Sequence, residues 1–360
     1  MQGIIPSTPA EVLNLPPAFK TKMNRAFTLA KIFRFWDRPY KKAATAFEEM
    51  DVKDKFYWVY KCTNPITRVE KGQRAADLVS PNKRIVDLPK GFEKQASITM
   101  GAAGDLFQTE VLANSKDIFF ENVTDLLFDQ TISYANFESP ITEQELKQEG
   151  LSDQEIPIEC CTPTQFDILK GHKGKNFNII NTANNHMFDL GIEGVRATQK
   201  ILKETGILDV GTNGTPAEYG QGKIITKDGI KIGVVSATFS LNGRQMPADE
   251  NYRINVSKLT SKFSKPELDI LKLQIDHCKA QGCDFIIASL HWGYEFEFFP
   301  RQQQVDTAHA LVEYGVDAIL GHHPHVIQPV EYYRTKRDNN RVAVIAYSLG
   351  SLAWNLPLRI

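Results

Sequence analysis

The sequence lacks several features that would place it in a special class of protein. It has no apolar run long enough to span a bilayer, and its start lacks the charged and apolar regions of a signal peptide. Its five cysteines are scattered and odd in number, and none has zinc-ligand spacing, which favours a reducing compartment. The formal net charge of -1 gives no argument for a nucleic-acid partner. We therefore expect a cytoplasmic protein, peripheral to a membrane at most.

What is present fits a soluble protein with a sizeable core, since 42% of the 360 residues are hydrophobic and 24% are charged. The charge is unevenly distributed: residues 1–95 hold 18 basic against 10 acidic residues. We interpret residues 1–95 as a basic, partly helical N-terminal extension. It is expected to lie on the acidic remainder or to contact an acidic protein or membrane surface. Within it the pattern predicts a helix over 20–36, a strand over 56–60 and a linker over 80–95.

From Ser97 onward the rhythm changes to strands that alternate with helices, which predicts an α/β fold. Helices are predicted over 191–204, 266–281 and 301–314, and Asp228-Gly229 predicts a hairpin turn. The predicted strands cover residues 97–102, 131–135, 177–181, 230–237, 284–290, 317–320 and 342–347.

Residues of the types that bind metals follow five of these strands. They are Asp105, Asn136 and Glu138, Asn184 to His186, His291 to Glu295, and the pair His323 and His325. In α/β sheets, functional groups gather in the crevice at the carboxyl ends of the strands. Pro324 is expected to keep the backbone extended, so that the histidines on either side of it point the same way. The plain alternative for this pair is a turn whose histidines hydrogen-bond locally.

The chemistry of the set suits divalent metal ions. Carboxylates supply charge, while imidazoles and an amide oxygen complete a neutral coordination shell. Two cations about 3.5–4 Å apart can share a hydroxide and bind the oxygens of a phosphoryl centre. A histidine outside the coordination shell can then protonate the leaving group.

These motifs resemble the calcineurin-like metallophosphoesterase superfamily, and within it the CapA (poly-γ-glutamate capsule biosynthesis) family. The resemblance covers residues 97–354 and rests on five strings: Gly104-Asp105; Asn136-Phe137-Glu138-Ser139-Pro140; Ala183-Asn184-Asn185-His186-Met187-Phe188-Asp189; His291-Trp292-Gly293-Tyr294-Glu295; and Gly321-His322-His323-Pro324-His325. It implies an αββα sandwich of two mixed sheets over residues 96–360.

The resemblance also implies roles for individual residues. The metal ligands would be Asp105, Glu138, Asn185, His291, His323 and His325. Asp105 and His325 would bind one ion, Glu138 would bridge, and the other three would bind the second. The cofactor is expected to be Mn, Fe or Zn, as one ion or two.

Other residues of the matching strings have expected roles beside the metal. His186 resembles the family's non-ligating acid. Asp189 either orients His186 or caps the helix that follows. Trp292 is expected to wall the site, Glu295 to support His291, and His322 to be a neighbour and not a ligand.

Some positions depart from the family pattern. Phe107 stands where the superfamily has a histidine ligand, which favours a single metal or a weak second one. The chain ends at Ile360, earlier than the family pattern, so the last strands of the sandwich are expected to be absent. Set against the resemblance, the basic segment is expected to stand where capsule members commonly have a membrane anchor.

The resulting hypothesis is a metal-dependent hydrolase or transferase. It would act on a phosphoryl or acyl centre, including γ-glutamyl and peptide-like bonds, of an anionic small-molecule or polymer substrate. One alternative is a non-catalytic assembly component of a polymer synthesis or export system, which docks through residues 1–95. Another is a metal-independent enzyme that uses His186 and Asp189 as acid and base on a peptide.

Overall fold

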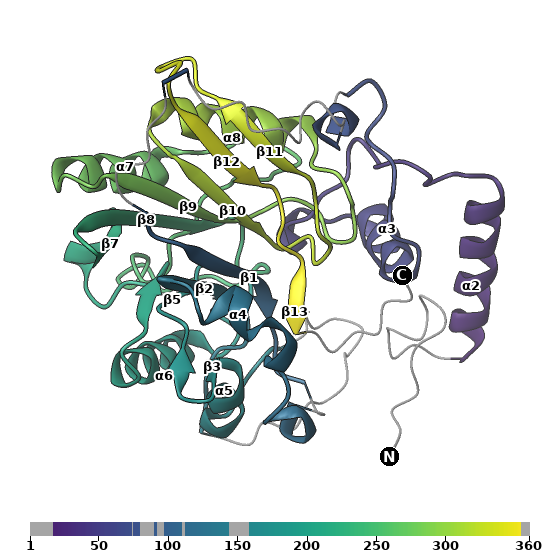
Figure 1. The fold of residues 1–360 in the computed structure, drawn as a ribbon. Coiled ribbons are helices and arrows are strands. Elements are labelled where there is room, and N and C mark those ends of the chain that lie inside the picture. The colour runs from purple at the N-terminus through teal and green to yellow at the C-terminus, as the bar shows by residue number, and fades with distance from the viewer. Residues whose placement is uncertain are drawn as a thin grey trace.

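The computed structural model describes residues 17–73, 75–79, 90–91, 97–109, 112–143 and 158–353. Two sheets lie face to face, helices cover their outer faces, and the N-terminal segment (residues 17–79) packs at one side (Figure 1). The predicted α/β sandwich of two sheets is thereby confirmed, but only the six-stranded sheet is mixed as expected, whereas the five-stranded sheet is parallel. Of the predicted linker over 80–95, only residues 90–91 fall within the described part of the chain.

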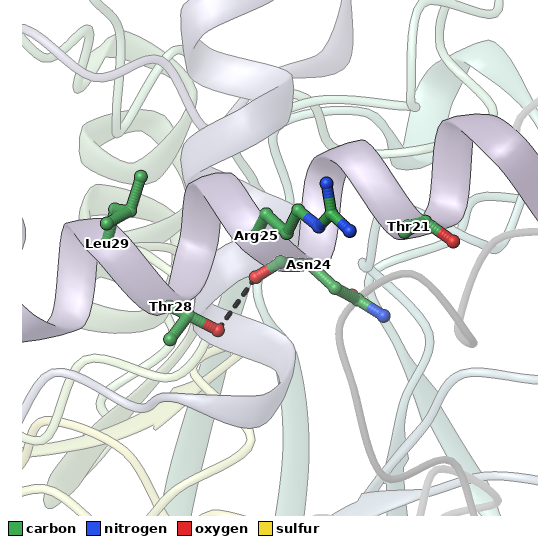
Figure 2. A pocket seen from close by; sticks show the side chains of 5 residues that line it. All are labelled: Thr21, Asn24, Arg25, Thr28 and Leu29. Carbon is green, nitrogen blue, oxygen red and sulfur yellow. Dashed lines mark hydrogen bonds between the residues drawn. The ribbon is translucent and has the colours of Figure 1, made fainter.

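The N-terminal segment contains two helices, α2 (Pro17–Ile32) and α3 (Val52–Thr63). Met23 and Phe27 of α2 are buried against Tyr57 and Tyr60 of α3, at the helical spacing that the sequence predicts. The opposite side of α2 lines an open hollow (Figure 2). Among the described residues, no helix combines the length and apolar character needed to cross a bilayer.

The predicted strand over residues 56–60 is wrong, because these residues lie in α3. Asp51 caps this helix: its carboxylate accepts from the Asp54 backbone at 2.9 Å, and the Asp54 carboxylate accepts from the Asp51 backbone at 3.1 Å. This reciprocal pair is a helix-start signal. The run of aromatic and β-branched residues that follows it favours a strand by composition, and so obscured the signal.

The five-stranded sheet has the order β13-β1-β2-β5-β6, and all its neighbouring strands run parallel. Its strands are β1 (Met100–Leu106), β2 (Ile132–Phe137), β5 (Ile179–Asn181), β6 (Leu208–Val210) and β13 (Ser351–Ala353). The first predicted strand, over 97–102, ended too early, because β1 continues through the buried carboxylate of Asp105. A charged residue inside a strand departs from the apolar pattern on which the prediction depended.

The six-stranded sheet has the order β11-β12-β10-β9-β8-β7 and is mixed. Its four central strands run parallel, and β7 and β11 are antiparallel edges. The predicted turn at Asp228-Gly229 joins β7 to β8, with φ values of 48° and 79°. The strands are β7 (Lys223–Lys227), β8 (Ile230–Thr238), β9 (Phe285–His291), β10 (Ala318–His322), β11 (Val330–Arg334) and β12 (Val342–Ala346).

Helices on the outer faces close the sandwich (Figure 1). They are α4 (Thr124–Leu127), α5 (Pro163–Leu169), α6 (Gly191–Glu204), α7 (Asp269–Ala280) and α8 (Gln302–Tyr314). The prediction for α6 is confirmed, whereas α7 begins at Asp269 and not at Pro266. Short elements complete the described fold: β3 (Gly171–His172), β4 (Lys175–Asn176), and the 3₁₀ helices η1 (Phe47–Glu49), η2 (Ala75–Val79), η4 (Leu112–Ser115), η5 (Glu121–Val123) and η6 (Pro216–Glu218).

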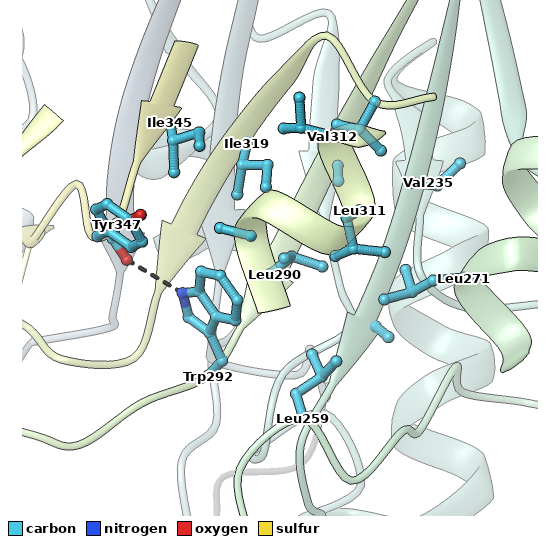
Figure 3. Packing of buried hydrophobic residues seen from close by; sticks show 14 of the residues in the cluster. Val235, Leu259, Leu271, Leu290, Trp292, Leu311, Val312, Ile319, Ile345 and Tyr347 are labelled. Atoms are coloured by element: carbon cyan, nitrogen blue, oxygen red, sulfur yellow. Dashed lines mark hydrogen bonds between the residues drawn. The ribbon is translucent and has the colours of Figure 1, made fainter. Parts of the chain in front are cut away.

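Alternating side chains build one core between the sheets and one under each helical layer. In β8, Ile232 and Val234 belong to the core between the sheets, while Val235 belongs to the core beneath α7 and α8. Figure 3 shows that second core, in which Trp292 donates from its indole nitrogen to the Tyr347 carbonyl at 3.1 Å. The prediction that Trp292 walls the site is therefore wrong, since the ring is fully buried in this core.

Candidate metal centre

The predicted site residues meet at the carboxyl ends of the strands, all buried except His186, which is partly exposed. Asp105 lies within β1, Glu138 directly follows β2, and His291 ends β9. The remaining predicted residues lie on the loops after β5 and β10: Asn185, His186, Asp189, His323 and His325. Both sheets therefore contribute to one cluster at the edge where their parallel strands end, which is where functional groups gather in α/β sheets.

Glycine is required next to this cluster because the backbones approach closely. A Cβ at Gly104, the residue before Asp105, would collide with the backbone carbonyl of Gly350. One at Gly321 would collide in the same way with the carbonyl of Tyr347. The glycines thus allow β1 and β10 to bring Asp105 and the histidine loop together.

We call Asp105, Glu138 and His291 the strand-built group, because each lies in a strand or directly after one. Their donor atoms all lie within 4.8 Å of one another. The Asn136 amide donates to Asp105 Oδ1 at 2.9 Å and to Glu138 Oε1 at 2.8 Å, and so holds the two carboxylates side by side. His291 Nε2 is 2.7 Å from Asn185 Oδ1 and 3.7 Å from Glu138 Oε2.

We call Glu295, His323 and His325 the loop-built group, because all three lie on loops after β9 and β10. Their donor atoms are also within 4.8 Å of one another. The His323 ring lies 5.0 Å from that of His291 and 5.8 Å from that of His325, so the two groups are adjacent. This grouping differs from the division between two ions that the family resemblance implies, and the role of each ligand remains a prediction.

The loop that holds the two histidines is not extended. His323 has φ 92° and His325 has φ 57°, both in the left-handed region that non-glycine residues rarely adopt. The expectation of an extended backbone around Pro324 is therefore wrong. The two rings nevertheless lie near each other, because the two left-handed residues turn the chain back on itself.

His322 serves as a neighbour of the site, as predicted. Its Nδ1 is 2.9 Å from Asp105 Oδ1, and its Nε2 is 2.8 Å from the Tyr134 hydroxyl, so both ring nitrogens have protein partners. On the other side, His325 Nδ1 lies 3.0 Å from Asp105 Oδ2. Burial opposes the charge of Asp105, but the hydrogen bonds with His322 and His325 outweigh it and hold its pKa well below the usual range.

Burial shifts the acids and imidazoles of the set in opposite directions. It raises the pKa of Glu138 well above the usual range, and the nearby Asp105 carboxylate raises it further. It lowers the pKa values of His291 and His323 well below the usual range, and that of His325 to about 4. These imidazoles are therefore neutral near pH 7, which is the form that binds metals.

His186 forms a hydrogen-bonded pair with Asp189 at the edge of the cluster. Its Nδ1 is 2.8 Å from Asp189 Oδ2, an oxygen that also accepts from the Glu159 backbone at 2.9 Å. Burial alone lowers the pKa of His186, but the Asp189 carboxylate outweighs this effect and raises it. Asp189 does not cap the following helix, whose N-cap is Leu190 without a side-chain bond. Of the two roles expected for Asp189, the structure therefore agrees with the contact to His186 and not with the helix cap.

Two buried atoms of the cluster make it suitable for a cation. Glu138 Oε2 and His323 Nδ1 have no hydrogen-bond partner among the described residues, although both side chains are buried. A buried polar atom without a partner is unfavourable, and a cation bound beside either atom would satisfy it. Carboxylate oxygen and neutral imidazole nitrogen are ligands of Mn, Fe and Zn, so the residues fit such an ion.

Sequence reasoning missed several residues of the cluster. Glu295 was expected to support His291, yet it groups with His323 and His325 and accepts a hydrogen bond from the indole N–H of Trp58. Burial raises the pKa of Glu295 to about 7, and that of Glu159 likewise to about 7. Trp58 is remote in sequence from the motifs, and no local pattern marks its contact with the site.

The family-model match and the curated relatives described next both point to a capsule-related family. The model of the family described as "Bacterial capsule synthesis protein PGA_cap" matches residues 93–355. "Capsule biosynthesis protein CapA" from Bacillus anthracis is 26% identical over 275 residues, which are 74% of this chain and 62% of that protein. "PGA biosynthesis protein CapA" from Bacillus subtilis (strain 168) is 29% identical over 241 residues, 66% of this chain and 57% of that protein.

The chain thus spans about three fifths of the length of the curated relatives that it matches. Among solved structures, a hypothetical protein from Thermus thermophilus is similar over 71% of this chain and 77% of its own. The sequence identity is 12% and the TM-score 0.41. This likeness is too low to bear on function, and the fold described above rests on its own strand order.

Proposed function

The chain belongs to the PGA_cap family of bacterial capsule synthesis proteins, and from that membership we propose that it is a metal-dependent hydrolase or transferase. Its reaction centre would be a phosphoryl or an acyl group, the latter including γ-glutamyl and peptide-like bonds. The relatives' names, with their reference to capsule and PGA biosynthesis, favour an anionic small-molecule or polymer substrate for this chain as well.

One observation carries the proposal: the buried cluster in which Glu138 Oε2 and His323 Nδ1 have no partner among the described residues. The strand-built group supplies charge through Asp105, whose pKa is held low, and a neutral imidazole through His291. When bound, a divalent cation supplies Lewis acidity and makes a water molecule more acidic. The chain's own part is to present these donors at fixed positions and to exclude bulk water, since the donors are buried.

His186 is the proposed acid. With Nδ1 engaged by Asp189, Nε2 is the nitrogen that would give a proton to the leaving group. Asp189 fixes the orientation of the ring and raises its pKa, which favours the protonated form that a general acid needs. Arg244 pairs with Asp189 at 3.1 Å and is partly exposed, so it lies where an anionic substrate would approach His186.

Metal analysis tests this proposal. The protein is stripped with chelator, incubated separately with Mn²⁺, Fe²⁺ and Zn²⁺, and measured by mass spectrometry for metal per chain. We expect one or two equivalents in the wild type, a loss in His323→Ala, and wild-type content in the control His277→Ala, which alters a half-buried histidine on α7. Metal that is absent from the wild type, or unchanged in His323→Ala, contradicts the assignment.

A substrate panel then separates the metal-dependent reaction from the metal-independent alternative. Phosphomonoesters, phosphodiesters and γ-glutamyl amides are offered to the stripped and the reloaded protein. Turnover only after reloading supports the proposal. Turnover of a peptide in excess chelator instead favours His186 and Asp189 acting alone as acid and base.

The second candidate function is a non-catalytic assembly component that docks through the end of α2. The observation that favours it is an exposed apolar patch of Leu29, Ile32, Phe33 and Phe35, whose side chains are 54–76% exposed, next to the basic Arg34. Exposed aromatic residues mixed with positive charge suit an anionic membrane surface. The hollow lined by Thr21, Asn24, Arg25, Thr28 and Leu29 lies along the same helix (Figure 2).

Vesicle sedimentation tests this second function. Vesicles that contain phosphatidylglycerol should bind the wild type and release the double variant Phe33→Ser/Phe35→Ser. Vesicles of phosphatidylcholine alone should bind neither. Phe263→Ser is the matched control, because Phe263 is 77% exposed and lies outside the N-terminal segment. Equal binding of the wild type and the double variant contradicts docking through this patch.

A further inference from the structure

Two side chains of the N-terminal segment reach the loop-built group, although the family match covers only residues 93–355. Thr45 Oγ1 lies 3.1 Å from His323 Nε2, and the indole N–H of Trp58 donates to Glu295 Oε2. We propose that Thr45 and Trp58 position His323 and Glu295 so that these two residues, with His325, bind a second divalent cation. The inference rests on the proposed function, because it presumes that the strand-built group binds the first cation.

The contact with Thr45 decides which nitrogen of His323 faces the cation. Because Nε2 is engaged by the threonine hydroxyl, Nδ1 is left for a ligand, and Nδ1 is the buried atom without a partner among the described residues. A metal-binding histidine is commonly oriented by a hydrogen bond from its other ring nitrogen. Thr45, outside the family match, supplies the oxygen that accepts this bond, and is therefore a positioning residue of this site.

The contact with Trp58 does the same for the carboxylate. Glu295 is the acidic member of the loop-built group, and the ring of Phe107, 5.3 Å from that of His325, contributes no donor atom there. The negative charge that a second cation requires on this side therefore comes from Glu295. Because the bond from Trp58 engages Oε2, Oε1 is the oxygen that we assign to the cation.

Buried anchors fix the N-terminal segment to the loop that carries Glu295. The Glu297 carboxylate accepts from the Tyr57 hydroxyl at 3.0 Å and from Lys61 Nζ at 3.4 Å. It also accepts from two nitrogens of the Arg301 guanidinium, at 2.9 and 2.8 Å. Because Glu297 is two residues from Glu295, these bonds hold Trp58 and its acceptor at a fixed separation.

The segment also stabilises backbone that is strained. Phe296 has φ 61°, in the left-handed region shared by His323 and His325. Its N–H donates to Pro324 O at 2.8 Å, which joins the two loops, while its carbonyl accepts from Ile66 N at 2.8 Å. Phe298 N donates to Ile66 O at 2.9 Å, so Ile66 forms a short parallel bridge with Glu297, the residue directly after the strained one. The loop-built group thus depends on contacts with residues 45–66.

Calorimetry with MnCl₂ on the stripped full-length protein tests the inference. Thr45→Val removes the hydroxyl and keeps the shape, and Trp58→Phe removes the indole N–H. The matched controls are Thr28→Val, whose hydroxyl bonds within α2 at 2.9 Å, and Trp36→Phe, whose indole nitrogen has no hydrogen-bond partner among the described residues. Thr45→Ser restores a hydroxyl and serves as the rescue.

The wild type is expected to bind two equivalents of Mn²⁺. The affinity of the weaker equivalent should fall by about 10–100-fold in Thr45→Val and in Trp58→Phe, and should be retained in Thr45→Ser and both controls. A single equivalent in the wild type, or two that neither variant weakens, overturns the inference and leaves the proposed function intact. No binding at all by the wild type defeats the proposed function itself, so the two failures are distinguishable.

Discussion

The strand-built and loop-built groups are adjacent, yet they are held in place by different means. Asp105 and His291 lie within strands of the two sheets, and the Asn136 amide joins Asp105 to Glu138. The loop-built group instead depends on left-handed residues and on the N-terminal segment. Positions set by the sandwich lie within the part of the chain that the family match covers. Positions set by Thr45 and Trp58 depend on a segment outside the family match.

The largest expected effect is that of His186→Ala on kcat, and it should leave metal binding by both groups unchanged. His186→Ala should lower kcat by about 100–10,000-fold on whichever substrate the panel identifies, because the leaving group loses its acid. Metal content should stay at the wild-type value, since the side chain belongs to neither group. Steady-state kinetics and metal analysis on one preparation check both expectations. Unchanged kcat in His186→Ala would remove the residue from the mechanism.

The next prediction concerns the joint between the N-terminal segment and the loop-built group. Glu297→Gln leaves the buried cations of Lys61 and Arg301 without their carboxylate partner. Removing one partner of such a pair costs about 3–5 kcal/mol in the free energy of unfolding. Urea denaturation measures it. The control is Glu218→Gln, whose partly exposed pair with Lys223 should contribute about 1 kcal/mol or less. Equal losses of unfolding free energy in the two variants would show that the Glu297 ion pairs contribute no more than an exposed pair.

A substitution at Asp105 should affect both groups at once. Asp105→Asn removes the charge that Oδ1 presents to His322 and Oδ2 presents to His325. We expect the affinity for Mn²⁺ to fall by about 100-fold for every equivalent bound, because metal ligands that lose their hydrogen-bond partners bind metal about 10–100-fold more weakly. Calorimetry measures the change. The control is Asp209→Asn, which alters a carboxylate of β6 outside both groups. Loss of only one equivalent would mean that the groups bind independently.

The smallest expected effect compares two carboxyls of the five-stranded sheet. Asp105 has a lowered pKa, whereas burial raises the pKa of Asp209 to about 6, despite hydrogen bonds from Thr182 and Thr212. A raised folded-state pKa gives stability that is present at low pH and is lost as pH rises through about 6. The stability of the wild type relative to Asp209→Asn should therefore fall by about 1 kcal/mol between about pH 5 and pH 7. Denaturation at both pH values measures it, and a constant difference would contradict a raised pKa.

The same contrast explains how much the sequence could predict. His291, His323 and Asp105 were found because each lies near the carboxyl end of an apolar strand or just beyond it, and parallel strands bring these ends to one edge. Glu295 lies in the same motif as His291, but its actual neighbours, His323 and Trp58, lie on other segments. Thr45 has no local signal at all. Its role depends on how the N-terminal segment packs, which periodicity does not encode.

The local errors have equally specific causes. Residues 56–60 have a composition typical of a strand, yet the capping pair of Asp51 and Asp54 and the burial of Tyr57 and Tyr60 favour the helix. Pro324 suggested an extended loop, whereas its neighbours are left-handed because Phe296 and Asp105 hydrogen-bond to that loop's backbone. In both places, tertiary contacts outweigh the local preference.

Anomalous diffraction from crystals grown with Mn²⁺ tests the central claim most directly. If the cluster binds a divalent cation, a peak will lie about 2.0–2.3 Å from Glu138 Oε2 or His323 Nδ1, two buried atoms of the cluster that lack protein partners among the described residues. A peak at His323 Nδ1 will be absent from crystals of His323→Ala. A protein that carries stoichiometric Mn²⁺ but shows its peak elsewhere, with these two atoms still unbound, would contradict the claim.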